Sequence, residues 1–86
     1  MNDVELKARI LGLLTDIAPD VDADSVQSDV DFRDQFDFDS MDQLHFAIAL
    51  HQAFEIDIPE SEYPRLASID KCLAFVRART STGGTR

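Results

Sequence analysis

Ser40 stands at the point where a helical pattern begins, and its hydroxyl is the group best placed for chemistry. Asp39 precedes it, and Asp42 follows within the first helical turn. A helix N-terminus leaves backbone N–H groups unpaired and carries a positive partial charge, so it favours an anionic group attached to a hydroxyl there. Serine is also a common helix cap. The junction therefore predicts either a modified hydroxyl or an ordinary cap.

The other reactive residue types do not form a catalytic or metal-binding set. His45 and His51 are six positions apart, so they do not share a helix face at ligand spacing. Asp20, Asp22 and Asp24 begin like a calcium loop, but the later positions that need glycine and glutamate hold serine and aspartate. We therefore expect no metal site and no enzymatic activity.

Charge and composition restrict the class of protein further. The 86 residues include 8 Lys and Arg against 17 Asp and Glu, a net charge of −9. Such a surface repels nucleic acid and anionic lipid, and it attracts basic protein surfaces. Cys72 is the single cysteine, which excludes an intrachain disulfide. It falls on the inner face of the last predicted helix, which indicates a buried core thiol. We see no signal peptide and no run of the ~18 apolar residues that a membrane span needs, so we expect a cytoplasmic monomer.

Helical periodicity predicts an all-α domain. Apolar residues recur at helical spacing over about 3–17, 40–54 and 68–79. Pro64 restricts any helix within 60–66 to about one turn, because proline cannot continue a helix normally. We find no convincing strand pattern.

A long connection separates the first two main helices. Residues 19–39 are rich in Asp and Ser, but their phenylalanines indicate that the loop is pinned to the core. The fold class is therefore a small antiparallel four-helix bundle, with three main helices, one short helix and this long loop between helices one and two. We assign 1–80 to one domain and 81–86 to a flexible C-terminal tail.

The second main helix carries more apolar surface than a core-facing helix needs. At about 100° per residue, its apolar side chains span roughly 220° of arc, about twice the usual width. We assign one edge to the core, formed by Phe46, Ala47, Leu50 and Phe54. The other edge is either further core or a partly exposed protein-docking surface, and we favour the second interpretation for Met41, Leu44 and Ile48.

The residues around Ser40 resemble the acyl carrier protein family. Its members have a phenylalanine in the loop, an Asp-Ser-Leu or Asp-Ser-Met signature, and Ile-Pro after their second helix. This chain has Phe32 in the loop, Asp39-Ser40-Met41 at the helix start, and Ile58-Pro59 after the helix. The resemblance covers roughly 4–78. It implies that a transferase moves phosphopantetheine from coenzyme A onto Ser40, and that the arm's thiol then carries acyl groups as thioesters.

The resemblance also implies partners and roles for nearby side chains. Asp39 is expected to contact the phosphopantetheinyl transferase or its metal ion during loading. The other implied partners are acyl-loading, condensing or acyl-transfer enzymes of fatty-acid, polyketide or related biosynthesis, with basic docking surfaces. We expect partners to touch Asp37, Met41, Asp42, Leu44, His45 and Ile48. We expect the acyl chain to be sheltered by Phe32, Leu50, Ile58, Leu66 and Cys72.

The chain departs from the family pattern in its charges. Asp37 stands where the family commonly has glycine, and His45, His51 and Gln52 replace glutamates on the exposed side of the helix. Acidic residues concentrate in the loop instead, so we infer that partners touch the loop and the helix start more than its later turns. Two alternatives stay open, namely an aminoacyl or peptidyl carrier, and an unmodified helical adaptor.

Overall fold

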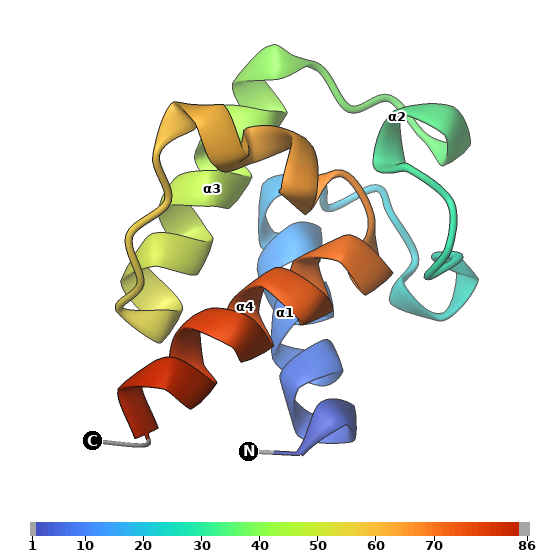
Figure 1. The fold of residues 1–86 in the computed structure, drawn as a ribbon. Helices are drawn as coiled ribbons and strands as arrows, with labels where there is room; N and C mark the ends of the chain where they lie inside the picture. The colour runs from blue at the N-terminus through green and yellow to red at the C-terminus, as the bar shows by residue number, and fades with distance from the viewer. Residues whose placement is uncertain (1, 85–86) are drawn as a thin grey trace.

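The computed structural model describes residues 2–84, with side chains to residue 80, as an all-helical chain. Figure 1 shows the elements in order along the chain. They are α1 (Asp3–Ile17), η1 (Ala23–Ser25), α2 (Phe32–Gln35), α3 (Ser40–Phe54), η2 (Glu60–Leu66) and α4 (Ile69–Gly84), where η denotes a 3₁₀ helix. The described residues include no strand, and the predicted all-α class is confirmed.

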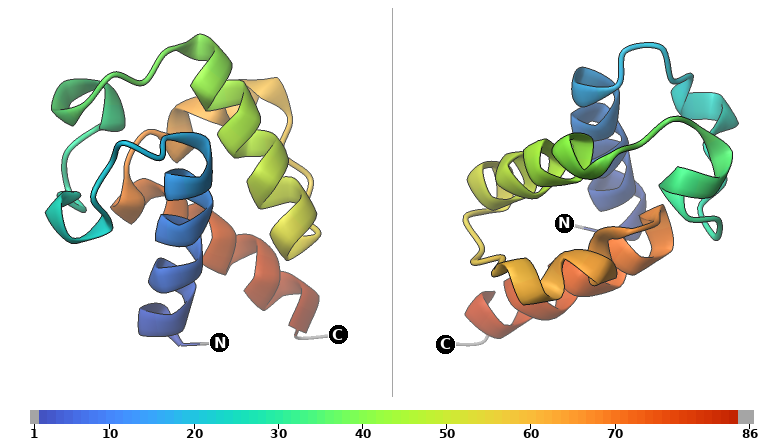
Figure 2. Two further views of the ribbon diagram at one scale, coloured as in Figure 1. Left: turned by 180° about the vertical axis from the view of Figure 1, so that it is seen from behind. Right: turned by 90° about the horizontal axis from the view of Figure 1, so that it is seen from above.

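The three long helices pack around one shared core. α1 runs opposite to α3, and α4 crosses both obliquely, as the views in Figures 1 and 2 agree. α1 contacts both other long helices, while η2 bridges α3 and α4. The short fourth helix is η2, and Pro64 lies inside it. Proline has no N–H and clashes with the carbonyl four residues earlier in an α-helix, which accounts for the tighter 3₁₀ form.

The ends of α1 follow from local sequence. Asn2 accepts a hydrogen bond from the Glu5 N–H (2.9 Å), and Glu5 accepts one from the Asn2 N–H (3.3 Å), so a capping box starts the helix. α1 ends at Ile17 because Pro19 disfavours helical geometry at Ala18, which has φ −123° and ψ 76°.

The core draws buried side chains from every long helix and from the loop. On α3 it takes Phe46, Ala47 and Leu50, while Phe54 packs partly against it, so the predicted inner edge is confirmed. The remaining buried apolar residues are Leu6, Ile10, Leu14, Phe32, Phe38, Ile56, Leu66, Ile69, Cys72, Phe75 and Val76.

The long loop is pinned by an aromatic cluster, as its phenylalanines predicted. Phe32 is fully buried at the centre of this cluster. Its ring centroid lies 5.2 Å from that of Phe38, 5.6 Å from that of Phe46 and 5.7 Å from that of Phe36. These separations suit edge-to-face and offset contacts, which add to simple burial. The loop is therefore part of the core.

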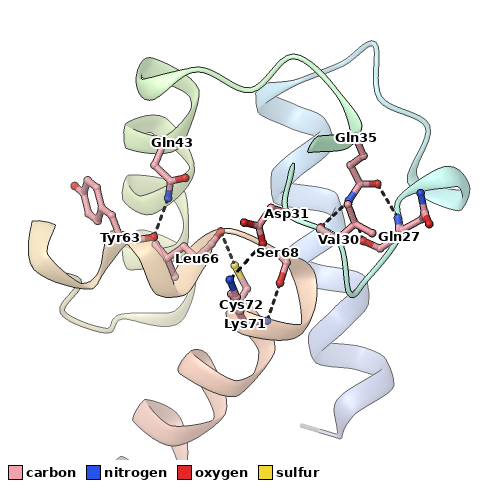
Figure 3. A network of polar contacts seen from close by, with 10 residues as sticks. All are labelled: Gln27, Val30, Asp31, Gln35, Gln43, Tyr63, Leu66, Ser68, Lys71 and Cys72. Atoms are coloured by element: carbon pink, nitrogen blue, oxygen red, sulfur yellow. Dashed lines mark hydrogen bonds and ion pairs between the residues drawn. The ribbon is translucent and has the colours of Figure 1, made fainter. Parts of the chain in front are cut away.

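Hydrogen bonds fix the same loop to the start of α4. The Phe32 N–H donates to the Ala67 carbonyl (2.8 Å), and the Asp70 N–H donates to the Ser28 carbonyl (3.0 Å). Figure 3 shows Gln35 closing the loop on itself through the backbone of Gln27 and Val30. The sequence did not predict α2 or η1, because each is too short to show a periodic pattern.

The predicted end of the last helix, near Arg79, is wrong, since α4 continues to Gly84. No proline follows Pro64 in the sequence, and threonine and glycine weaken a helix without blocking its hydrogen bonds. Residues 85–86 lie outside the described residues, and the mobility of 81–86 stays a prediction. No helix in the described part is long and apolar enough to cross a membrane.

We predict that Phe32→Ala lowers the free energy of unfolding by about 3–5 kcal/mol, because it leaves a cavity where three other rings meet. Urea denaturation followed by circular dichroism measures this. Val4→Ala is the control, since Val4 is 78% exposed, and it should change stability by less than about 0.5 kcal/mol. A loss below about 1 kcal/mol for Phe32→Ala would show that the loop is not anchored by this ring.

Candidate functional site

The first turn of α3 is set by two aspartates. Asp39 has extended backbone geometry, and its Oδ1 accepts a hydrogen bond from the Asp42 N–H (2.9 Å). Asp42 Oδ2 accepts one from the Asp39 N–H in return (3.3 Å). This reciprocal pair is a capping box, and it fixes the start of the helix at Ser40. The alternative that Ser40 caps the helix is therefore wrong.

Ser40 is exposed at the first helical position. Its hydroxyl makes no hydrogen bond with any residue that the structure describes. Two positions earlier, Phe38 is only 5% exposed and holds the backbone against the core. The Ser40 hydroxyl is thus accessible on a well-anchored backbone, and the fold does not use it.

The surroundings of Ser40 are strongly acidic. Residues 19–42 contain nine acidic residues and one arginine, so this segment alone has a net charge of −8. A cleft between the end of α1 and the start of α3 is lined by Asp20, Asp22, Asp37 and Asp42, together with apolar side chains. The sequence did not predict that Asp20 and Asp22 lie near the start of α3, because they are about 20 residues away along the chain.

The site can accept a covalently attached phosphodiester on Ser40. The N–H groups of the first helical turn have no partner within the helix, and the helix dipole favours an anion at this end. The nearby carboxylates of Asp39 and Asp42 repel a phosphate instead. A covalent bond would hold such a group in place against this repulsion, and the acidic surroundings match basic partner surfaces better than they match a phosphate.

The outer edge of α3 is exposed, as predicted. Met41 is 55% exposed, Leu44 is 37% exposed and Ile48 is 43% exposed. They follow Ser40 along one face of the helix, and His45 lies exposed beside them. Large apolar side chains left in water next to each other are typical of a protein-docking surface.

The predicted acyl-chain residues do not share one open site. Phe32, Leu50, Leu66 and Cys72 are fully buried in the core. The fifth, Ile58, is partly buried and lines a groove between α3 and η2. Four of the five therefore have no groove surface in this conformation, because the core closes over them.

The groove between α3 and η2 includes Tyr63, which the sequence did not single out, and His51, which the sequence analysis placed on the exposed side of the helix. His51 and Tyr63 line it beside Ile58. His51 Nδ1 lies 2.6 Å from the Ile56 carbonyl, which only accepts, so Nδ1 carries the proton and donates. Gln43 donates to the Tyr63 carbonyl (3.3 Å) and ties α3 to η2 (Figure 3). His51 lies within the helix predicted over about 40–54, but no local sequence pattern predicts the groove that it lines.

Cys72 is an inert core thiol, as predicted. Its Sγ lies 3.5 Å from the Leu66 carbonyl, and the side chain is fully buried. Burial raises the pKa of the thiol well above its ordinary value, because the thiolate is poorly solvated there. Cys72 therefore stays protonated and does not supply a nucleophile. Across the described residues, no group of three or more His, Cys, Asp or Glu is arranged to hold a metal ion.

The helical fold and the accessible Ser40 match a small carrier of a covalent group, and comparison with known proteins gives its family. The model of the family described as "Phosphopantetheine attachment site" matches residues 8–76. The acyl carrier protein of Picosynechococcus sp. is 31% identical over 61 residues, which cover 71% of this chain and 75% of that protein. The acyl carrier protein of Prochlorococcus marinus is 30% identical over 59 residues, covering 69% and 74%. That of Lactobacillus acidophilus is 26% identical over 78 residues, covering 91% and 96%.

The chain therefore belongs to the acyl carrier protein family, whose prosthetic group is covalently bound phosphopantetheine. Members of this family carry a group between enzymes rather than transform it themselves. The resemblance seen in the sequence around Ser40 is confirmed at the level of the family.

We predict that Asp39→Ala lowers the free energy of unfolding by about 1 kcal/mol, because it removes the cap of α3. Ser40→Ala should change it by less than about 0.5 kcal/mol, since the hydroxyl has no structural role. Chemical denaturation of both variants measures the difference, and Asp39→Asn, which retains a capping oxygen, is the control. If Ser40→Ala costs as much as Asp39→Ala, the serine takes part in capping.

Proposed function

We propose that this chain carries acyl groups as thioesters on a phosphopantetheine arm attached to the Ser40 Oγ. The observation that carries the proposal is that the capping box at the start of α3 does not involve the Ser40 side chain. Asp39 and Asp42 cap the helix, which leaves the exposed hydroxyl of Ser40 without a role in the fold. The membership of the chain in a phosphopantetheine-binding family supplies the group that this hydroxyl would take.

Loading requires a partner enzyme, because no described residue accepts a hydrogen bond from the Ser40 hydroxyl and so none is placed to take its proton. The Ser40 Oγ forms a bond to the phosphorus next to pantetheine in coenzyme A and gives its proton to a base of the transferase. The bond between that phosphorus and the adenosine bisphosphate half breaks. Asp39 Oδ1 is occupied by the Asp42 N–H, but its Oδ2 accepts no hydrogen bond from a described residue. This free oxygen supports a contact between Asp39 and the transferase or its metal ion.

We propose that an acyl chain shelters between α3 and η2. Ile58 lines the groove there, and the core residues Leu50, Leu66, Cys72 and Phe32 are apolar and fully buried. We propose that the chain enters at Ile58 and reaches these residues only if the core opens to admit it. Burial of each CH₂ group contributes about 0.8 kcal/mol, which offsets part of the cost of that opening.

Partner enzymes are proposed to dock on the acidic and apolar surface around Ser40. Basic surfaces match the charge of the 19–42 segment, and apolar side chains match the exposed edge of α3. The proposed contact residues are Asp37, Met41, Asp42, Leu44, His45 and Ile48. The partners are the transferase and acyl-loading, condensing or acyl-transfer enzymes of fatty-acid, polyketide or related biosynthesis. We propose that the carrier acts as a cytoplasmic monomer with no chemistry of its own.

The names of the relatives favour acyl over aminoacyl or peptidyl cargo, since the similar proteins are acyl carrier proteins. An unmodified adaptor would never receive the phosphopantetheine arm, whereas an acyl carrier and an aminoacyl or peptidyl carrier both would. The mass of the chain therefore separates the adaptor from either kind of carrier.

Incubation with coenzyme A and a phosphopantetheinyl transferase is predicted to add one phosphopantetheinyl group to the chain. Ser40→Ala should abolish the gain, because it removes the accepting hydroxyl, and intact-mass spectrometry measures both. Ser61→Ala is the matched control, since it removes another exposed hydroxyl. Loading of Ser40→Ala, or no loading of the wild-type chain, would contradict the proposal.

Asp37→Lys is predicted to weaken binding of the transferase about tenfold, because it reverses an exposed charge within the proposed docking surface. Asp57→Lys is the matched control, as it makes the same change beyond the far end of α3. Gln52→Glu, on the later turns, should also have little effect. Asp42→Lys is less informative, because it also breaks the capping box. Calorimetry with Ser40→Ala as background measures the affinities, and equal losses for Asp37→Lys and Asp57→Lys would remove the loop from the docking surface.

A further inference from the structure

The charges of this protein are segregated between two parts of the chain. The segment around Ser40, residues 19–42, has a net charge of −8. Residues 60–86 contain five cationic side chains and three acidic ones, a net charge of +2 within a chain of −9. Four of these cations, Arg65, Lys71, Arg77 and Arg79, belong to η2 and α4. The C-terminal elements therefore present a surface of a different kind from the Ser40 site.

A shallow apolar groove lies between η2 and α4, two elements in direct contact. Pro64 contributes from η2, and Ala74, Phe75 and Ala78 contribute from α4. Ala74 is exposed, and it shares a helix face with Ala78 one turn later. These small side chains leave room for the side chain of another molecule.

Three cations rim this groove. They are Arg65 on η2, and Lys71 and Arg79 on α4. The Arg79 guanidinium lies 4.7 Å from the ring centroid of Phe75, which holds it at the rim through a cation–π contact. The groove thus combines an apolar floor with a fixed positive edge.

The rim cations are held only loosely by the carboxylates of this chain. Glu62 serves two of them, Arg65 at 3.1 Å and Arg79 at 3.9 Å, and Lys71 pairs with Asp31 at 3.3 Å. All these cationic side chains are substantially exposed, and such surface pairs are worth little. Three cations face two carboxylates, so positive charge remains for an outside partner.

We propose that the groove between η2 and α4 docks a second protein through an acidic segment that carries an apolar side chain between its carboxylates. The apolar side chain would sit over Ala74 and Ala78, and the carboxylates would meet Arg65, Lys71 and Arg79. The carboxylate partner follows from charge complementarity, and the apolar anchor follows from the floor of the groove.

A peptide segment fits these charges better than an anionic membrane does. A segment contacts the groove alone, where the 19–42 segment reaches the rim through Asp31 beside Lys71. The charges of the 19–42 segment that lie farther than about 8 Å from the groove are screened at physiological ionic strength. An anionic bilayer presents a broad surface that also faces the acidic part of the molecule. The docking site lies on other elements than Ser40, so the partner can bind with or without the arm.

The test uses a synthetic helical peptide with leucines on one face, flanked by glutamates. Titrated into ¹⁵N-labelled protein, it should shift the amide signals of η2 and α4. Ala74→Glu should weaken its binding about tenfold, because it places a carboxylate on the floor of the groove. Ala8→Glu is the matched control, since Ala8 is an exposed alanine of α1 and receives the same change. Lys71→Glu should also weaken binding, and Ser40→Ala should bind like the wild-type chain.

Four results of the peptide titrations would overturn this proposal. They are no binding at millimolar peptide, shifts confined to other elements, equal affinities of Ala74→Glu and Ala8→Glu, and unchanged affinity when the leucines are replaced by serine. If concentrating the protein alone shifts the same amides, the groove is covered by a second copy and the proposal is also wrong. Circular dichroism of each variant shows that the comparison is made between folded proteins.

Discussion

The reciprocal hydrogen bonds between Asp39 and Asp42 are the constraint on which the site depends. They start α3 at Ser40 without using the serine itself. Phe38, just before the box, is buried beside Phe32 and Phe46. The helix start is therefore fixed both by its cap and by a buried ring. A serine placed one residue inside such a box is exposed and anchored, which is what a tether for a flexible arm requires.

The same helix divides its apolar side chains between two purposes. One edge fills the core, and the opposite edge stays in water next to the acidic loop. In a chain of 86 residues the core is too small to bury the whole arc, so an exposed apolar edge is unavoidable. The loop adds negative charge at the same end, and the cations gather on η2 and α4. The result is a polarised surface with two regions suited to partners of opposite charge.

Much of this could be read from the sequence, and the failures have physical causes. Long elements with a regular apolar period, such as Asp3–Ile17 and Ser40–Phe54, were predicted at their observed bounds. The exposed edge of α3 was predicted from the width of the helix's apolar arc alone. The capping role of Asp42 was missed, because Glu and Gln are the usual partners in a capping box. The short helix α2 is held by a hydrogen bond from the Phe32 N–H to the distant Ala67 carbonyl, which no local pattern reveals. The 3₁₀ helix η1 is capped by Asp22 but is too short to show a periodic pattern. The acyl-chain residues were predicted from family resemblance, and in the structure most of them lie in a closed core.

Attachment of phosphopantetheine to Ser40 is tested most directly by tandem mass spectrometry of the protein purified from the cells that make it. Fragmentation of the peptide that spans Phe38 to Asp42 should locate a phosphopantetheine group on Ser40, with or without an acyl group on its thiol. The acyl mass would also identify the cargo. If the protein carries the group on another residue, or carries none in any preparation, Ser40 is not the attachment site and the central claim is wrong.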